Sequence, residues 1–229
     1  METKQLKLIN DEIINLDISS DILQNHFSNP RCCTVPILNQ TNSDYYKKFV
    51  NEEDKVILDL GANIGLVSIH LSPYADKIIS VEPTPSHFNI LKHFTKGFKN
   101  IECVQGAISY KKEITQFYIL EDTTENSLMS GKGGIEISVQ AYTLKNIIDM
   151  FNLETIDFVK IDIEGSEIKF LSEENIKTLG DCVKKFFIEF HTINGVHYKE
   201  YRDKYNTLFS NLGWGVENIN EDSLYCYKR

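Results

Sequence analysis

The sequence predicts an α/β protein built on one largely parallel β-sheet with helices on both faces. Three observations carry this prediction. From Lys55 onward, short apolar runs alternate with stretches of helical period, which is the pattern of a parallel sheet. The runs are apolar along their whole length, as expected for strands covered on both faces. The chain also finishes with two short strand-like runs around a turn, which predicts an antiparallel pair at the end of the sheet.

The composition fits a globular domain. The chain has 229 residues, of which 41% are hydrophobic and 25% charged, so it can bury a sizeable core without a disulfide or a metal. No run reaches the ~18 apolar residues of a transmembrane helix. The 24 basic and 33 acidic residues give a formal net charge of −9. This balance disfavours nucleic acid as a partner, because binding to phosphates needs clustered cations.

The cysteines and the polar start of the chain bear on location. Five cysteines lie at irregular spacings, without the C-x-x-C pattern of zinc or redox sites. We expect them to be free thiols in a reducing compartment. The first residues lack the apolar core of a secretory signal. These features predict a cytoplasmic protein.

The first 50 residues are expected to form an N-terminal cap segment, and residues 51–229 the main domain. Within the cap, residues 11–27 fit one or two short helices. Residues 29–38 fit a loop or an edge segment with two prolines.

The first half of the domain reads as alternating strands and helices. Three apolar runs predict buried strands at residues 55–60, 77–83 and 101–109. Two stretches of helical period lie between them, at residues 63–75 and 86–98. Pro73 would close the first helix, and Ser86 would be the N-cap of the second.

The middle of the chain differs from this pattern. Residues 114–120 and 135–144 are strand-like and flank a polar, glycine-rich stretch at 121–134. We expect a hairpin insertion at about 114–140 rather than another crossover unit. If the stretch 121–134 folds over the site, Asn126 and Ser127 would help to choose the substrate.

The second half returns to alternation. Helices are expected at residues 143–151, 166–179 and 196–213, and strands at 155–165 and 183–191. The closing pair of strands spans 214–229 around a turn at 220–222. Together with the earlier strands, these complete the predicted sheet.

The most informative string, DLGANIG at residues 59–65, follows the first strand. Ligands of such sheets bind outside the carboxyl ends of the strands. Gly61 would let the backbone turn tightly, and Gly65 would let the helix pack closely. A dinucleotide fingerprint would also need glycines where this chain has Asn63 and Leu66. The turn is therefore not expected to bind NAD.

Two carboxylates near this turn indicate a different cofactor. Asp59 would repel a pyrophosphate but suits a cationic ligand. Glu82 ends the second strand, where an acid can accept hydrogen bonds from both ribose hydroxyls of a nucleoside. Without a phosphate signature, the pattern predicts S-adenosylmethionine, with S-adenosylhomocysteine as product. Asp59 would face the methionine ammonium, directly or through water, and Glu82 the ribose.

A second group of polar residues follows the fourth and fifth strands: Asp162, Glu164, Glu189 and His191. These strand ends are neighbours in a doubly wound sheet, so we expect the four side chains to converge beside the sulfonium. Alternation along the strand places Glu189 and His191 on the same side. Glu167 fits the start of a helix equally well, where the helix dipole favours acids.

We expect these four residues to serve methyl transfer to an alcohol, which must lose its proton. His191 or Glu164 would take the proton as a base. Alternatively, Mg²⁺ or Mn²⁺ held by Asp162 and Glu189, with or without His191, would lower the pKa of the acceptor. The ligand spacing does not require a metal.

Four strings occur in the order and spacing of one family: VILDLGANIG, SVEP, VKIDIEGSEIKFL and IEFH. Residues of about 55–229 thereby resemble the FkbM family of S-adenosylmethionine-dependent methyltransferases, and the KIDIEG string at 160–165 is the most discriminating part. The resemblance implies a class I methyltransferase (Rossmann-like) fold. Such a fold has a seven-stranded sheet of order 3-2-1-4-5-7-6 with an antiparallel last strand. It also implies O-methylation of a sugar, glycan or other small natural product.

Two positions depart from the family pattern. Many relatives have an Asp where this chain has Lys145. Class I enzymes often end the third strand with an acid that contacts the adenine amino group. Here that contact would come from Gln105 or from the backbone of Gly106 and Ala107. The cofactor-binding residues implied in all are Asp59, Gly61, Ala62, Asn63, Gly65, Glu82, Pro83, Gly106, Ala107 and Asp162.

Two other functions remain as alternatives. One is methylation of RNA or DNA, although the Asn/Asp-Pro-Pro-Tyr motif of amino-methylating enzymes is absent and no second lysine completes a Lys-Asp-Lys-Glu tetrad. The other is a non-catalytic domain that only binds the cofactor. The presence of Asp59, Glu82, Asp162 and His191 makes the non-catalytic domain the least favoured of the three.

Overall fold

The structure is a computed structural model that describes residues 3–20, 24, 45–119 and 134–229. The expected loop or edge segment at 29–38 lies outside the described residues. So do most of the polar stretch 121–134 and the proposed substrate-contacting residues Asn126 and Ser127.

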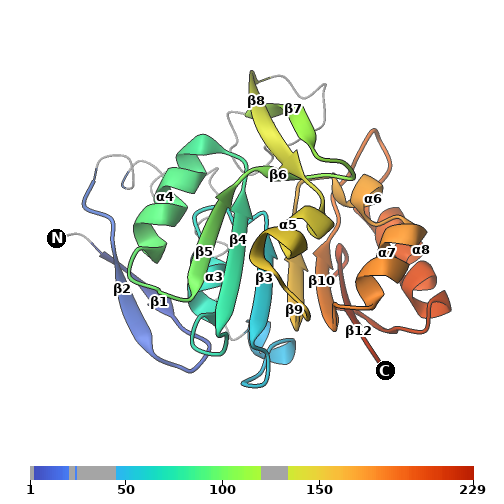
Figure 1. Ribbon diagram of the computed structural model, residues 1–229, viewed down its shortest axis with the longest axis horizontal. Helices are drawn as coiled ribbons and strands as arrows, with labels where there is room; N and C mark the ends of the chain where they lie inside the picture. The colour runs from blue at the N-terminus through green and yellow to red at the C-terminus, as the bar shows by residue number, and fades with distance from the viewer. Residues whose placement is uncertain (1–2, 21–23, 25–44, 120–133) are drawn as a thin grey trace.

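A seven-stranded sheet forms the centre of the described structure (Figure 1). Its strands are β3 (Val56–Leu60), β4 (Lys77–Glu82), β5 (Ile101–Gln105), β9 (Phe158–Ile161), β10 (Lys185–Glu189), β11 (Gly215–Asn218) and β12 (Ser223–Tyr227). Across the sheet they lie in the order β5-β4-β3-β9-β10-β12-β11. If these seven strands are numbered by their order in the chain, this is 3-2-1-4-5-7-6. The first five are parallel, and β12 runs antiparallel to both of its neighbours. The predicted α/β class and class I methyltransferase fold are confirmed.

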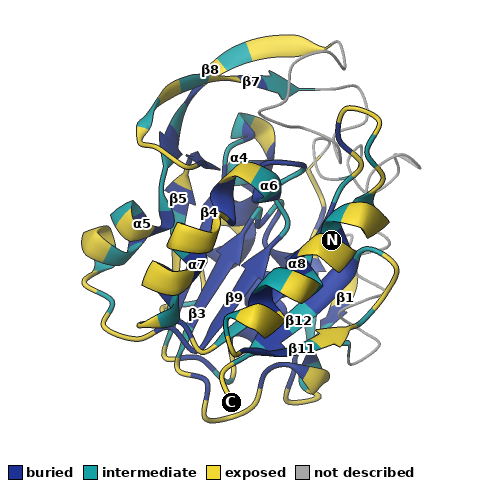
Figure 2. Ribbon diagram, turned by 90° about the vertical axis from the view of Figure 1, so that its right-hand side faces the viewer, coloured by how far each residue is buried: buried dark blue, intermediate teal, exposed yellow. Residues whose placement is uncertain are grey.

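Helices cover both faces of this sheet, because the strands are apolar on both sides. Alternate residues of β3 enter opposite cores: Leu58 packs in one and Ile57 in the other. The first core is completed by α5 (Leu144–Phe151), α6 (Glu167–Phe170), α7 (Glu173–Gly180) and α8 (Tyr198–Asn211). The second is completed by α3 (Leu66–Leu71), α4 (Pro85–Thr95) and the 3-10 helix η1 (Tyr45–Lys48). Figure 2 shows the central strands buried and the outer faces of the helices exposed.

The expected helices at residues 11–27 are wrong over residues 11–20, whereas Gln24, the described residue that follows, is helical. Ile13–Asp17 is strand β2, which pairs antiparallel with β1 (Thr3–Lys7). Leu16 and Ile18 are buried, whereas Asn15 and Asp17 between them are exposed. This alternation has the period of a strand covered on one face, and it prevails over the short apolar clusters that suggested helices.

The expected strand at 101–109 divides at Gly106. Its second part, β6 (Ala107–Ile108), leaves the main sheet and pairs with β8 (Ile135–Tyr142), which also pairs antiparallel with β7 (Glu113–Ile119). The predicted hairpin is therefore present, as part of a three-stranded sheet. In Figure 1 this small sheet stands above the carboxyl ends of the central strands.

Several helix boundaries also differ from expectation; the helix expected at 63–75, for example, is α3 (Leu66–Leu71). The N-cap of α4 is Thr84 rather than Ser86, because Pro85 already occupies the first helical position. The expected helix at 166–179 is two helices, α6 and α7. Ser172 begins the second by accepting a hydrogen bond from the Asn175 amide at 3.2 Å. In the described part of the chain, no helix is long and apolar enough to cross a membrane.

Candidate active site

The turn after β3 is held by backbone contacts that only glycine allows. Gly61 has φ +80°, and a Cβ there would lie 1.7 Å from the carbonyl oxygen of Asp162. The amides of Gly61 and Ala62 both donate to the Val81 carbonyl at 3.0 Å. Gly65 has φ +89°, and a Cβ there would lie 2.5 Å from Leu91 in α4. The close helix packing predicted for Gly65 is confirmed, and Gly61 makes room for the backbone that follows β9.

Glu82 ties this turn to the start of α4. One carboxylate oxygen accepts from the Asn63 amide at 2.9 Å, and the other from the Thr84 amide at 2.8 Å. Glu82 is only 5% exposed, and half-buried Pro83 follows it. Burial disfavours the ionised carboxylate and raises its pKa to about 7, although both backbone hydrogen bonds oppose this shift.

Asp59 is fully buried beneath the turn, and the cation beside it belongs to the protein. Ser68 donates to its Oδ2 at 2.6 Å, and the Lys160 ammonium lies 3.7 Å from its Oδ1. Lys160 also lies 3.1 Å from Asp162. Burial would lower the pKa of Lys160, but these two carboxylates hold it well above its ordinary value. Contact between Asp59 and the methionine ammonium stays a prediction, and Lys160 already balances part of its charge.

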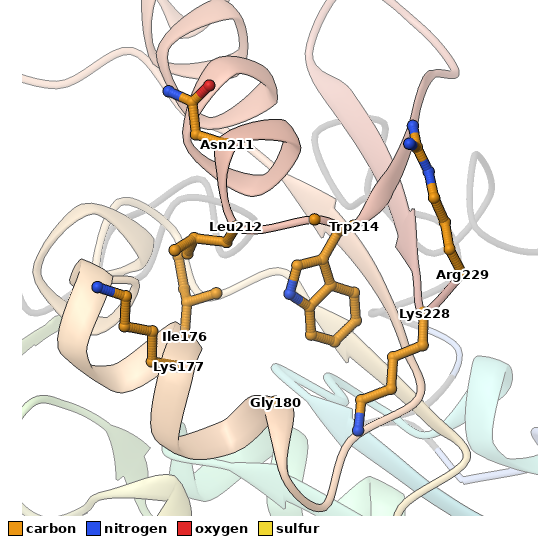
Figure 3. A pocket seen from close by; sticks show the side chains of 9 residues that line it. Ile176, Lys177, Gly180, Asn211, Leu212, Trp214, Lys228 and Arg229 are labelled. Carbon is orange, nitrogen blue, oxygen red and sulfur yellow. The ribbon is translucent and has the colours of Figure 1, made fainter.

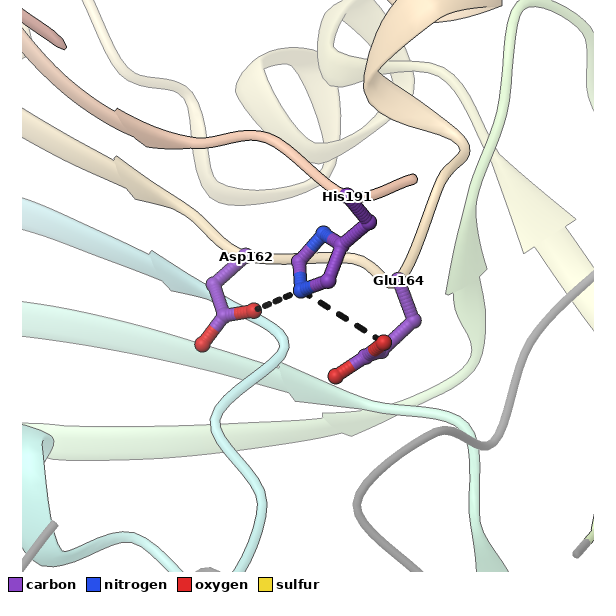
Figure 4. Close-up of side chains that lie close together, drawn as sticks. All are labelled: Asp162, Glu164 and His191. Carbon is purple, nitrogen blue, oxygen red and sulfur yellow. Dashed lines mark ion pairs between the residues drawn. The ribbon is translucent and has the colours of Figure 1, made fainter. Parts of the chain in front are cut away.

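Three side chains from the ends of β9 and β10 meet at the carboxyl edge of the sheet (Figure 4). The Nε2 atom of His191 lies 3.6 Å from Asp162 Oδ1 and 3.4 Å from Glu164 Oε2. Each side chain is between 21% and 24% exposed, so a ligand can reach it. We call Asp162, Glu164 and His191 the strand-end cluster. The backbone of Asp162 covers Gly61, so the cluster adjoins the turn.

Glu167 contacts the imidazole of His191 at Nδ1, the ring nitrogen that faces away from the cluster. Its Oε1 lies 3.1 Å from His191 Nδ1 and accepts from the Ile163 amide at 2.9 Å. Glu167 is fully buried. Burial would lower the pKa of His191, but the charge and hydrogen bond of Glu167, helped by Glu164 and Asp162, raise it well above its ordinary value. Glu167 is thus more than the start of a helix.

An unusual backbone conformation turns Glu164 toward His191. Glu164 has φ +54° and Gly165 φ +99°. A non-glycine residue in this region costs roughly 1–2 kcal/mol, which the surrounding contacts offset. Burial and the neighbouring carboxylates raise the pKa of Glu164 well above its ordinary value. Burial would raise the pKa of Asp162, but the neighbouring Lys160 and His191 outweigh burial and lower it.

Glu189 lies near the cluster but outside it. The charge of Asp162, followed by burial, raises the pKa of Glu189 to about 8. Among the described residues, no hydrogen bond or ion pair joins Glu189 to His191. The ligand atoms that lie within 4.8 Å of one another belong to Asp162, Glu164 and His191. Glu189 is not in this group, so the metal-ligand set expected from sequence, Asp162 and Glu189 with or without His191, stays a prediction.

Gly106 and Ala107 join the two sheets. A Cβ on Gly106 would lie 2.6 Å from the Tyr142 ring and 2.7 Å from the Gln140 carbonyl oxygen. The Gly106 amide donates to the Glu82 carbonyl at 3.1 Å, and Ala107 pairs with Ala141. This packing explains the glycine without a ligand, and the adenine contact stays a prediction.

A hollow of about 640 Å³ lies at the other end of the molecule (Figure 3). Its lining includes Lys177, Trp214 and Lys228. The Lys228 amide donates to the Lys184 carbonyl, next to the amino end of β10. Ligands of open α/β sheets bind at the carboxyl ends of the strands, so this hollow is not the candidate site.

Comparisons with known proteins identify the family of the chain. The family described as the Methyltransferase FkbM domain matches residues 59–213, which include both the turn and the cluster. "Methyltransferase sdnD" from Sordaria araneosa is 26% identical over 152 residues, which are 50% of this chain and 58% of that protein.

Among solved structures, the methyltransferase FkbM from Methylobacillus flagellatus KT has 16% identity and a TM-score of 0.49, over 93% of this chain and 63% of that one. A precorrin-6y C5,15-methyltransferase from Geobacter metallireducens GS-15 has 17% identity and a TM-score of 0.49, over 84% and 89%. This chain spans less than two thirds of the sdnD and FkbM proteins.

Proposed function

The chain belongs to the FkbM family of methyltransferases, and from this premise we propose that it methylates a hydroxyl oxygen of a sugar, glycan or other small natural product. The methyl donor is S-adenosylmethionine, which membership of a methyltransferase family implies. The observation that carries the proposal is the strand-end cluster, which offers an oriented imidazole directly beside the glycine turn.

In this proposal the cofactor lies across the turn and the cluster. Glu82 accepts backbone hydrogen bonds from Asn63 and Thr84, and its remaining acceptor capacity would serve the ribose hydroxyls. Pro83, Gly106 and Ala107 would border the adenine. The methionine end would lie near Asp59 and the backbone that follows Gly61.

The charges around the cluster favour a cationic ligand such as a sulfonium. Acidic side chains outnumber basic ones here, five to two. The seven residues are Asp59, Asp162, Glu164, Glu167, Glu189, Lys160 and His191. Opposite charges attract strongly where water is partly excluded.

The transfer itself needs placement and the removal of one proton. The hydroxyl oxygen attacks the methyl carbon, and the carbon–sulfur bond breaks with its electron pair on sulfur, which leaves S-adenosylhomocysteine. Holding both reactants in line supplies much of the acceleration. The hydroxyl proton goes either to His191 or Glu164 as a base, or to water from an oxygen bound to Mg²⁺ or Mn²⁺.

The test is to incubate the protein with methyl-labelled S-adenosylmethionine and panels of sugars, glycans and small natural-product alcohols, alongside RNA and DNA. We expect label on a hydroxyl oxygen of a small acceptor, located by NMR. The matched control is the same acceptor with that hydroxyl already blocked. Label in nucleic acid, or label on nitrogen or carbon, would contradict the proposal. Cofactor binding without transfer to any acceptor would favour a non-catalytic domain.

A further inference from the structure

We infer that Asp162, Glu164 and His191 form a binding site for one divalent cation, Mg²⁺ or Mn²⁺. The binding itself stands on the geometry of the strand-end cluster. The role of the cation in activating an acceptor rests on the proposed function.

The three ligand atoms already surround a point that a cation could occupy. They lie within 4.8 Å of one another, with His191 Nε2 3.6 Å from Asp162 and 3.4 Å from Glu164. In an octahedral site with bonds of about 2.1 Å, adjacent ligands are about 3.0 Å apart. The two separations from His191 are a few tenths of an ångström larger, and the two carboxylate oxygens lie within 4.8 Å of each other, so side-chain rotations would be needed to close the site.

The buried partner of His191 is an independent indication of a metal ligand. A histidine that binds a metal usually donates its other ring N–H to a carboxylate, which fixes the tautomer and the ring plane. Glu167 is placed for this role, fully buried, with Oε1 at 3.1 Å from Nδ1. A cation that displaced the proton from Nε2 would leave the other proton on Nδ1 and meet the Nε2 lone pair between Asp162 and Glu164 (Figure 4).

The second oxygen of Glu167 supports the same conclusion. Glu167 Oε2 is buried and has no hydrogen-bond partner among the residues that the structure describes. An unpaired buried carboxylate oxygen is costly unless positive charge lies nearby. A cation one imidazole away would supply that charge, together with Lys160 on the far side of Asp162.

The ligand types select the metal. Two carboxylates and one imidazole are hard to borderline donors, which suit Mg²⁺ and Mn²⁺, and no thiol lies in the cluster. Three protein ligands leave about three of six octahedral positions open. The open positions favour an acceptor with two neighbouring oxygens, such as a vicinal diol of a sugar, because both oxygens can bind at once.

The bond changes balance without any oxidant or reductant. One acceptor hydroxyl, bound through its oxygen, releases its proton to water because the cation lowers its pKa. The oxygen then attacks the methyl carbon of the sulfonium. The carbon–sulfur bond breaks, and its electron pair stays on sulfur.

The test measures Mn²⁺ binding to the whole purified chain, by the loss of the free-ion EPR signal and by calorimetry, without cofactor or acceptor. We expect one Mn²⁺ per chain, bound at least about tenfold more weakly in Glu164→Gln. Glu167→Gln keeps a hydrogen-bond acceptor but removes the charge, and should weaken binding by about 10–100-fold. The matched control is Glu154→Gln, an exposed acid away from the site, which should bind like the wild type. Circular dichroism checks that each variant is folded.

The inference is overturned if the folded wild type binds no Mn²⁺, or if Glu164→Gln binds it equally well. Hydroxyl methylation that continues undiminished in EDTA would overturn the activating role and leave the proposed function intact. Stoichiometric Mn²⁺ binding with no methylation of any hydroxyl would do the reverse, because it would support the site and contradict the proposed function.

Discussion

The glycine turn and the strand-end cluster are both built from acids at the ends of parallel strands, but their acids have different partners. In the turn, Asp59 and Glu82 are at most 5% exposed and are held by a hydroxyl and by backbone amides. In the cluster, Asp162, Glu164 and His191 are 21–24% exposed and contact one another. Backbone partners fix a carboxylate in one place, whereas side-chain partners can exchange for a ligand. We therefore expect the turn to be the rigid half of the candidate site, and the cluster its reactive half.

The sharpest test of this division is His191→Ala. Removing the imidazole should slow methyl transfer by about 10²–10⁴-fold, because the proton or the cation loses its principal partner. Cofactor affinity should change by less than about threefold, since the turn is untouched. Single-turnover kinetics and calorimetry measure the two effects separately. His93→Ala, on the exposed face of α4, is the matched control. Normal turnover in His191→Ala would end its proposed role.

In the glycine turn, Gly61→Ala should destabilise the fold. The new Cβ would lie 1.7 Å from the Asp162 carbonyl oxygen, and the residue would keep a φ of +80°. Steric overlap and the left-handed conformation together should cost about 2–5 kcal/mol of unfolding free energy, with loss of both binding and transfer. Urea denaturation measures the cost. Gly97→Ala meets nothing within 4 Å and should be nearly neutral; equal effects at the two positions would contradict the account.

Burial of Glu82 should appear as a pH dependence of stability. Its pKa is about 7 in the folded protein and 4.5 ordinarily, so between these values only the folded state keeps the proton. The stabilisation is complete below pH 4.5, falls as the pH rises, and is constant above about 7. The fall amounts to about 3 kcal/mol, and Glu82→Gln should remove it.

Urea denaturation from pH 4.5 to 7.5 follows this difference. Asp157 is the matched control, because Lys184 and two backbone amides outweigh burial and lower its pKa. In Asp157→Asn, the stability lost relative to wild type should stay nearly constant from pH 7.5 to 4.5, because the pKa of Asp157 is lowered from 3.8. Parallel curves for wild type and Glu82→Gln would show that Glu82 is ionised in the folded protein.

The smallest effect is expected at the hollow on the other side of the molecule. Lys177 is 60% exposed there and pairs with Glu173 one helical turn away. Lys177→Ala should change the unfolding free energy by less than about 0.5 kcal/mol and leave methyl transfer within about twofold. The same two assays measure this. A large loss of transfer would place part of the acceptor site in the hollow.

The central sheet could be predicted from sequence because its strands are continuously apolar and its helices have a clear period. The failures lie where two patterns compete. Ile13–Asp17 contains apolar residues that fit a short helix, and only its pairing with Thr3–Lys7 makes it a strand. Residues 101–109 look like one strand, but the second half pairs with β8, a partner more than 25 residues later in the chain.

The sequence predicted which acids gather at the candidate site better than it predicted the side chains that contact them. Asp162 and His191 were expected to converge, and they do. Lys160 was missed and the role of Glu167 was left open, because each is explained by a neighbour distant in sequence: Asp59 faces Lys160, and His191 faces Glu167. A lysine inside an otherwise apolar strand was the available signal, since a buried charge requires an opposite charge nearby.

The most direct test of the account is calorimetric titration of the folded protein with S-adenosylmethionine and S-adenosylhomocysteine, with NAD as the control. We predict that both sulfur nucleosides bind in the micromolar range, that NAD does not, and that folded Glu82→Ala binds them at least about tenfold more weakly, as expected for the loss of charged hydrogen bonds to ribose. A folded wild-type protein that binds neither sulfur nucleoside would contradict the account.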